Sequence, residues 1–531
     1  MPKGYLLLIL HAHLPYVRHP EYDRFLEERW FFEAVTETYI PLVKFFDKLQ
    51  EEGVPLKLTV SISPTLANMM NDPLLCERCA RHLEMMIRLA EQECERTRDW
   101  PDVNSLSWMY KRLFEEARET FVERYDMRLL TAFRRYAESG GLELITCAGT
   151  HGFLPLLSSE PHTVRAQVFA AVREHERLFG SKPKGLWLPE CAYYPGLDDV
   201  LAEAGVRYFV VDSHGIENAD PRPLFGVNAP VYCPSGVAAF GRHPTTSKLV
   251  WSSNVGYPAD YNYREYYRDI GYDLDDHYLE PFRYAEGIRS PTGIKYHRIT
   301  GTASDKHLYN PDWAAATAYR HAQDFAHRCR DQASRCRSHM PFPPVIVSPY
   351  DAELFGHWWF EGPQWLYQLM KELAGGGDLE PSTPGEYLAT YPIQQRATPS
   401  PNSWGQKGYH AHWVNAKTDW IWRPLHEAAV RMRQTVERNR AWPPRSLEAR
   451  VLRQAGRELM LAQSSDWPFM ITKGHADQYA RRRISDHLNR FHHLLGELDS
   501  QQIDPQRLEA FEHMDAIFPE LDHHLFAPSA V

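Results

Sequence analysis

The chain lacks a surplus of basic residues. Its 531 residues include 59 Lys and Arg against 69 Asp and Glu, which gives a formal net charge of -10. Nucleic acids and anionic membranes are bound through Lys and Arg that neutralise phosphates. We therefore expect neither a nucleic acid nor a membrane as a partner.

Long apolar runs and a dense cysteine framework are also missing. The N-terminal run YLLLIL has six residues and ends at His11, too short for a signal-peptide core or a membrane span. Eight cysteines in so long a chain agree with a reducing compartment, so we predict a cytoplasmic protein. Aromatic residues, by contrast, make up 13% of the chain, which suits stacking on sugar rings.

One cysteine pair has the spacing of a metal site. Cys76 and Cys79 form C-E-R-C, with His82 three residues later. The surrounding sequence has helical periodicity and no second such pair follows, so we interpret them as two thiols on one helix face. We predict no bound metal and no cofactor.

Repeats and low-complexity tracts are absent, so the organisation must come from periodicity. Several short β-rich runs end on residues able to do chemistry. The seven predicted strands are YLLLIL, LKLTVSIS, LELITCAG, GLWLP, VRYFVV, KLVW and PPVIVSPY. Amphipathic helical segments alternate with many of them, which predicts βα units and a parallel sheet.

A barrel explains this pattern better than a doubly wound sheet. Polar groups at the carboxyl ends of many strands converge on one site only if the sheet closes. A doubly wound sheet would need a glycine-rich loop after its first strand, where this chain has HAHLPY.

Two segments interrupt the alternation. Residues 72–138 are helical and charged, and we predict a helical insertion there. Residues 225–245 are rich in Gly, Pro and Ala, the composition of an exposed lid loop. We expect a catalytic domain over residues 1–395 and a helical C-terminal domain over residues 396–531.

Two carboxylates stand at predicted strand ends among aromatic residues, Glu190 and Asp351. Cleavage of a glycosidic bond with retention needs one ionised carboxylate that attacks the sugar and one protonated group that donates to the leaving oxygen. The alternative is that both are structural residues held in ion pairs.

The first strand ends in His11 and His13, whose rings project from the same face of a strand. With Asp212 or His151 they could bind a metal, or they could donate hydrogen bonds to sugar hydroxyls at the barrel mouth. The sequence alone leaves both possibilities open.

Several motifs in order resemble glycoside hydrolase family 57, and within it the α-1,4-glucan branching enzymes. They are HAHLPY, GTHGFLPLL, WLPECAY, SPYDAELFGHWWFEGP and the C-terminal SSDWPF. The resemblance covers almost the whole chain. It implies an α/β fold with an incomplete TIM-like (β/α)7 barrel, an inserted helical domain and an α-helical C-terminal domain.

The resemblance also assigns residues. It implies a retaining mechanism with Glu190 as nucleophile and Asp351 as general acid and base, and it favours sugar binding over metal binding for the histidines. Tyr232 matches a tyrosine at the tip of a flexible loop that is associated with transfer, and Tyr272 stands where related enzymes often have a tryptophan. The substrate-binding residues that it implies are His11, His13, Trp30, His151, Tyr232, Arg264, Tyr272, Trp404, Trp413 and Asp466.

The expected function is a glycosyltransferase that cleaves an α-1,4 bond of an α-glucan such as amylose, amylopectin or a glycogen-like polymer, and makes an α-1,6 branch. We expect a monomer or small homo-oligomer. The alternatives are an α-amylase or 4-α-glucanotransferase of the same family, a metal-dependent hydrolase or deacetylase that uses His11 and His13, and a glucan-binding protein without catalysis.

Overall fold

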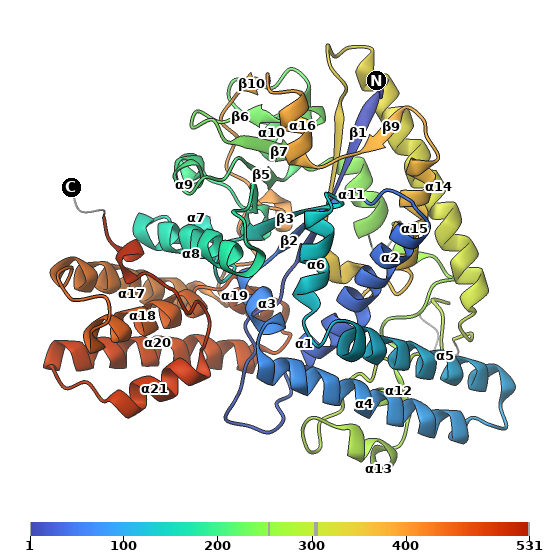
Figure 1. The fold of residues 1–531 in the computed structure, drawn as a ribbon, viewed down its shortest axis with the longest axis horizontal. Coiled ribbons are helices and arrows are strands. Elements are labelled where there is room, and N and C mark those ends of the chain that lie inside the picture. The colour runs from blue at the N-terminus through green and yellow to red at the C-terminus, as the bar shows by residue number, and fades with distance from the viewer. Residues whose placement is uncertain (1, 253–254, 302–305, 529–531) are drawn as a thin grey trace.

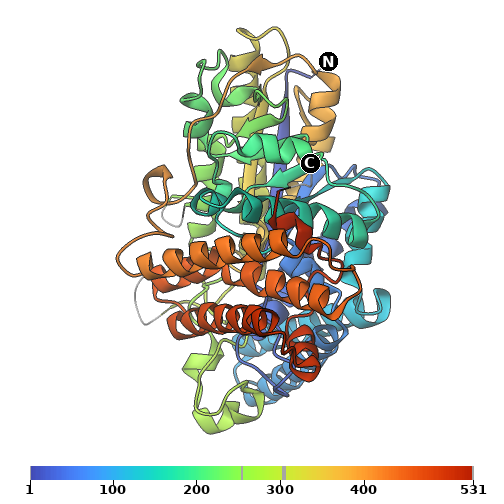
Figure 2. The same cartoon turned by 90° about the vertical axis from the view of Figure 1, so that its left-hand side faces the viewer.

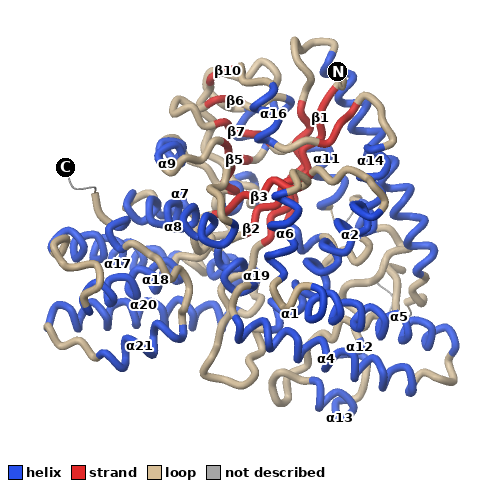
Figure 3. The backbone as a smooth tube through the Cα atoms, viewed as in Figure 1, coloured by secondary structure: helices blue, strands red, loops and turns tan. Residues whose placement is uncertain are grey.

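A parallel sheet forms the centre of the molecule, and helices surround it. The structure is a computed structural model that describes residues 2–252, 255–301 and 306–528. The strands lie in the middle and upper part of the view, and the C-terminal helices form a separate layer at one side (Figure 1, Figure 3).

The sheet has the order β10-β6-β7-β5-β4-β3-β2-β1-β8, and β9 also pairs with β1. From β8 to β7 along this order, every neighbouring pair is parallel. The strands are β1 (Gly4–Ala12), β2 (Leu58–Ile62), β3 (Leu142–Cys147), β4 (Gly185–Trp187), β5 (Tyr208–Val211), β6 (Val231–Tyr232), β7 (Ala238–Gly241), β8 (Val345–Asp351), β9 (Leu379–Pro381) and β10 (Gln395–Arg396).

Seven parallel strands therefore build an incomplete barrel, as expected. Its two edges, β7 and β8, are joined by a backbone hydrogen bond of 2.8 Å from His243 N to Val347 O. Six of the predicted strands are confirmed, but KLVW is helical and belongs to α11 (Pro244–Trp251). Pro244 at the first turn and His243, which caps the N–H of Thr246, begin that helix.

The seventh strand is β7, within the segment that we expected to be a lid. That expectation for residues 225–245 is wrong, because β6 and β7 form an antiparallel hairpin that closes between Cys233 and Val237. β7 also pairs with β5 inside the sheet, and its four residues are buried. A small residue such as Ala238 fits beside the rings of Tyr208 and Phe240 in the barrel interior. The strand therefore has the small-residue composition that is otherwise typical of a loop.

Helices alternate with the strands and cover the outside of the sheet. Those of the barrel and its connections are α1 (Arg29–Ala34), α2 (Ile40–Glu51), α3 (Pro64–Met70), α6 (Leu129–Glu138), α7 (Leu154–Leu157), α8 (Pro161–Phe179), α9 (Leu197–Glu203), α10 (Ser213–Glu217), α11, α12 (Ile270–Asp273), α13 (Asp276–Leu279), α14 (Pro311–Arg337), α15 (Gly362–Ala374) and α16 (Pro384–Thr390).

The predicted insertion contains a pair of packed helices, α4 (Pro73–Arg96) and α5 (Pro101–Arg118). They extend along the lower edge of the view (Figure 1). Helix α6, at the end of the segment, packs on β3 and α2 and so belongs to the barrel. Cys76 and Cys79 lie on α4 with both thiols buried, as the helical periodicity predicted.

The C-terminal helices form one compact layer (Figure 2). They are α17 (Asp419–Arg438), α18 (Leu447–Ala462), α19 (Asp466–Lys473), α20 (Asp477–Ser500) and α21 (Pro505–Met514). The segment before them stays with the barrel, because Arg396 pairs with Tyr232 and Asn402 bridges to Tyr193.

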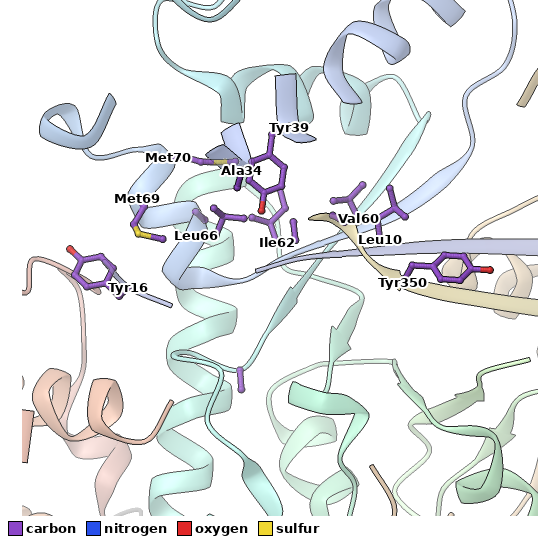
Figure 4. Close-up of a cluster of buried hydrophobic side chains, with 14 of the residues drawn as sticks. Leu10, Tyr16, Ala34, Tyr39, Val60, Ile62, Leu66, Met69, Met70 and Tyr350 are labelled. Atoms are coloured by element: carbon purple, nitrogen blue, oxygen red, sulfur yellow. The ribbon is translucent and has the colours of Figure 1, made fainter. Parts of the chain in front are cut away.

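The hydrophobic core has two parts because the strands have two faces. Ile9, Cys147, Trp187 and Phe240 fill the barrel interior. The other face packs against the helices, where the side chains drawn in Figure 4 include Leu10, Val60 and Ile62 from the strands and Tyr39 and Leu66 from the helices. In the part of the chain that the structure describes, no helix has the length and apolarity needed to cross a membrane.

Candidate active site

Glu190 lies three residues after the end of β4, in the short turn Pro189–Cys191 at the carboxyl end of the barrel. Its φ is 60° and that of Cys191 is 50°, two consecutive residues in the left-handed region that side chains disfavour. Cys191 N closes the turn on Leu188 O at 2.8 Å. Backbone strain of this kind persists where the surroundings impose it, which is typical of functional sites.

Two side chains hold the carboxylate of Glu190. Trp404 Nε1 donates to Oε2 at 2.7 Å and Ser465 Oγ donates to Oε1 at 2.9 Å. Burial raises the pKa of Glu190, and the charge of Asp466 adds to this, while the two hydrogen bonds and the charge of His13 oppose it. The two donors fix the carboxylate and stabilise its ionised form.

Asp351 ends β8, and the strand register places it beside His11. Burial raises its pKa well above the ordinary value, the negative charges of Glu353 and Glu190 raise it further, and Arg242 opposes them. Among the described residues, no side chain donates a hydrogen bond to its carboxyl group. These surroundings favour the protonated form that a general acid needs.

Three histidines form a packed group at the ends of β1 and β3. His13 stacks on His151 with 3.7 Å between ring centroids, and His11 stacks on Trp187 with 4.6 Å. His11 Nε2 lies 3.0 Å from His151 Nε2, and His151 Nδ1 lies 2.7 Å from Ser465 Oγ. Because Ser465 donates to Glu190, it can accept a hydrogen bond from His151 Nδ1–H, and His151 Nε2 can then accept one from His11 Nε2–H. This set of tautomers links His11 to the carboxylate through His151 and Ser465.

His13 differs because an acidic partner faces it. Its Nε2 lies 3.0 Å from an oxygen of Asp466 and its Nδ1 lies 2.9 Å from Ser63 Oγ. Burial lowers the pKa of His13, but the charge and hydrogen bond of Asp466 and the charges of Glu353 and Glu190 outweigh it, so the pKa is raised. Burial raises the pKa of Asp466, and His13 outweighs this and lowers it to about 2.

The same residues bear on the metal-dependent alternative. His13, His151 and Asp466 offer ligand atoms close enough together to hold a metal ion. The ring nitrogens of the three histidines, however, already have partners in Ser61, Ser63, Ser465, Asp466 and one another. The arrangement is a closed hydrogen-bond network rather than a set of lone pairs aimed at an open position.

The C-terminal domain contributes directly to this network. Ser464 bridges Gly152 in antiparallel fashion, and Ser465 N donates to His151 O at 2.9 Å. This backbone pairing joins the SSDWPF motif to the GTHGF motif. Ser465 and Asp466 are thereby held against Glu190 and His13.

Two tryptophans lie beside the nucleophile candidate. Trp404 is half-buried and its backbone N–H also donates to Glu190 O at 3.0 Å. Trp251, at the end of α11, stacks on Trp404 with 6.0 Å between ring centroids and an interplanar angle of 23°, and its side chain is 49% exposed. An exposed ring stacked on a half-buried one is a suitable platform for a sugar.

The other predicted substrate residues lie in different surroundings. Trp30 is half-buried at the start of α1 and packs edge-on against Tyr479, with 5.7 Å between centroids. Tyr272 on α12 is 48% exposed, so a ring is available at the position where related enzymes often have tryptophan. Their contact with substrate stays a prediction.

Arg264 lies under the surface. Only 5% of it is exposed, its guanidinium lies 4.0 Å from the ring centroid of Phe360, and Nη1 donates to Tyr110 of α5 at 3.4 Å. Arg264 thus joins the inserted helices to the barrel, so the structure favours the structural interpretation over a substrate contact.

Two other predicted substrate residues lie away from the strand ends that carry the carboxylates or are buried. Tyr232 pairs with Ala238 at the start of β7, level with Tyr208 at the start of β5, and so lies at the end of the barrel opposite Glu190. Trp413 is 1% exposed and stacks on Phe153 with 4.4 Å between centroids, sealing the domain junction. The strand register and the burial do not support a substrate contact for either ring.

Sequence reasoning missed three residues of the site. Ser465 belongs to the SSDWPF motif, Glu353 follows Asp351 by two positions in its motif, and Trp251 lies in the KLVW run that the sequence predicts as a strand. Glu353 accepts hydrogen bonds from His13 N at 3.1 Å and from the Tyr39 hydroxyl. The D-A-E spacing, with Glu353 two positions after Asp351, is the feature of the sequence that could have indicated it.

A barrel of parallel strands that carries two buried carboxylates at its strand ends has the groups that a glycoside hydrolase needs. Residues 7–398 match the model of glycosyl hydrolase family 57, and residues 424–526 match that of the C-terminal domain of 1,4-alpha-glucan branching enzymes. The chain therefore belongs to glycosyl hydrolase family 57.

Similar proteins carry two kinds of name. The 1,4-alpha-glucan branching enzyme TK1436 of Thermococcus kodakarensis is 33% identical over 97% of this chain and 77% of that protein. A branching enzyme structure from Pyrococcus horikoshii has a TM-score of 0.89 at 31% identity and covers 99% of this chain and 97% of that one. The α-amylase AmyC structure from Thermotoga maritima has a TM-score of 0.93 at 44% identity and covers 100% of both chains.

Proposed function

We propose that this protein is a retaining 1,4-α-glucan branching enzyme. The observation that carries the proposal is the contact between domains: the helical C-terminal domain, which matches the branching-enzyme model, places Ser465 within 2.9 Å of Glu190 and Asp466 within 3.0 Å of His13. A domain whose side chains hydrogen-bond to the candidate nucleophile and to a neighbouring histidine is part of the catalytic site rather than an accessory module.

The reaction has two halves. The carboxylate of Glu190 attacks C1 of a glucose unit in an α-1,4 chain while Asp351 gives its proton to the departing O4, which leaves a covalent glucosyl-enzyme. Asp351, now ionised, then takes the proton from the 6-hydroxyl of a second chain as that oxygen attacks C1 and releases Glu190. The product is an α-1,6 branch of retained configuration.

The surroundings of each carboxylate suit its role. Trp404 and Ser465 hold Glu190 in position and accommodate its charge, whereas burial and two nearby carboxylates keep the proton on Asp351. Of the two members of the nearby ion pair, Asp466 raises the pKa of Glu190 and His13 opposes that rise, so the hydrogen bonds from Trp404 and Ser465 are what favour the ionised form.

Hydrolysis is the second candidate, and a specific observation favours it. Tyr232, matched by resemblance to a loop tyrosine associated with transfer, lies at the wrong end of the barrel. The structure most similar in sequence among those described above is called an α-amylase. Water and a second glucan chain compete for the same glucosyl-enzyme, so both products can arise at one site.

Incubation with amylose tests the proposal. Branching forms α-1,6 linkages, which appear as new short chains after treatment with a debranching enzyme, and it creates few reducing ends. Reducing ends without α-1,6 linkages would identify an α-amylase. New chain lengths without additional reducing ends and without α-1,6 linkages would identify a 4-α-glucanotransferase.

A further inference from the structure

A cavity lies between the barrel and the C-terminal domain, away from the two carboxylates. It encloses about 490 Å³, including space open to solvent, between the loop that follows β1 and one face of α20. The loop and this helix are held together by His19 Nε2 and Tyr479 Oη at 2.8 Å and by Arg483 Nη2, which donates to Tyr16 O at 3.1 Å. The cavity is therefore a feature of the domain junction and exists only while the domains are docked.

Aromatic rings line one side of this cavity. Tyr22, which is 51% exposed, lies 5.1 Å from Phe25 between ring centroids, and Phe25 lies 6.1 Å from Tyr479. Tyr479 in turn contacts Trp30 at 5.7 Å and Trp467 at 6.0 Å. Trp467 follows Asp466, so these rings lead from the cavity toward the reaction centre.

Polar groups of both signs line the other side. Arg18 and Arg490 are already paired, with Asp72 at 2.8 Å and Asp515 at 2.7 Å. Arg482 and Asp486 also line the cavity and, among the described residues, form no hydrogen bond or ion pair. A donor and an acceptor without partners, in a cavity that the exposed ring of Tyr22 also lines, are thus available to a ligand.

This lining suits a neutral polyhydroxyl compound better than an anion. Sugar hydroxyls both donate and accept, so they can bind Arg482 and Asp486 together, and the apolar faces of pyranose rings stack on aromatic side chains. A phosphate would meet the carboxylates of Glu21 and Asp486 beside Arg482. The paired arginines have little charge left to offer it.

We propose that this cavity is a second glucan-binding site, which holds a stretch of an α-glucan chain remote from the scissile bond. This inference rests on the proposed function for the class of ligand. A chain anchored both here and at the reaction centre must reach from one to the other, so the cavity would favour long chains over short ones.

Binding is tested without turnover. Electrophoresis of the Glu190→Gln protein through native gels that contain amylopectin measures retardation by the glucan. Adding Tyr22→Ala or Asp486→Ala should weaken the apparent affinity roughly tenfold, because each removes a direct contact. In the active enzyme the same substitutions should raise KM for amylose more than KM for maltohexaose. Tyr319→Ala, which removes another exposed tyrosine, is the matched control and should change neither.

Three results would overturn the proposal. One is retardation that is unchanged in both variants. Another is an equal rise in KM for long and short substrates. The third is a thermal stabilisation by inorganic phosphate that Arg482→Ala abolishes while retardation persists, which would identify an anion site instead. A failure of the branching assay with normal, Tyr22-dependent retardation would refute the proposed function alone.

Discussion

The two carboxylates of the site lie at the ends of β4 and β8 and differ in how they are held. Glu190 has a strained backbone and accepts hydrogen bonds from Trp404 and Ser465, both outside the sheet. Asp351 extends β8 without strain and has only burial and neighbouring charges around it. A nucleophile needs a fixed position and stable charge, whereas an acid and base needs a proton that moves in both directions.

Removal of either carboxylate should give the largest effect. Glu190→Gln and Asp351→Asn should each lower the branching rate on amylose by on the order of 10⁴-fold or more, since each group acts in both halves of the reaction. Glu427→Gln, an exposed carboxylate on α17, is the control. The rate is measured by the appearance of α-1,6 linkages.

An activated substrate separates the two roles. Fluoride leaves α-maltosyl fluoride without a proton, and azide attacks C1 without a base, so both alanine variants can turn over with azide. Asp351→Ala should give the α-azide, because Glu190 still forms the covalent intermediate, whereas Glu190→Ala should give the β-azide by direct displacement. The reverse pair of configurations would show that the assignment of roles is wrong.

Loss of one donor to Glu190 should have the next largest effect. Ser465→Ala should lower kcat about 10 to 100-fold, because a hydrogen bond to a charged group is lost. A missing donor also raises the pKa of Glu190, so the acidic limb of the kcat/KM profile should move to higher pH. Ser485→Ala on α20 is the control. A lower kcat with an unmoved acidic limb would mean that Ser465 only supports the structure.

This difference between the carboxylates shows what the sequence could predict. Glu190 and Asp351 were found because each follows a run of apolar residues within a short stretch. Ser465 was not found, since it contacts Glu190 across 275 positions of sequence. Long-range contacts of this kind depend on how the C-terminal domain docks, which periodicity does not encode.

The errors in the fold have equally local causes. The sequence does not predict β7 because Ala238 and Ala239 lack the branched side chains that mark strands. Ala238 faces the barrel interior, where a small residue fits beside Tyr208 and Phe240. KLVW was misread because a short apolar run fits a strand or a helix, and the Pro244 start signal decides between them.

A change beside Asp351 should shift its pKa rather than abolish activity. The charge of Glu353 raises the pKa of Asp351, so Glu353→Gln should lower it. Because the reaction needs protonated Asp351, the alkaline limb of the kcat/KM profile should then move to lower pH by about one unit. Glu361→Gln is the control, a buried carboxylate of the same motif. An alkaline limb that stays in place would assign it to another group.

The smallest expected effect concerns the competition between water and glucan. Trp251→Ala removes the exposed ring that stacks on Trp404, and Trp404 holds Glu190. Water should then reach the glucosyl-enzyme more easily, and the acceptor chain should bind less well. The ratio of reducing ends to α-1,6 linkages should therefore rise several-fold, which corresponds to a loss of about 1 kcal/mol in the preference for glucan over water. Trp251→Phe should lie between. Tyr232→Ala is the informative control, since its ring is at the far end of the barrel and the ratio should stay the same. If the ratio changes in Tyr232→Ala and not in Trp251→Ala, then Tyr232 is the residue that keeps water from the glucosyl-enzyme, and Trp251 has no such role.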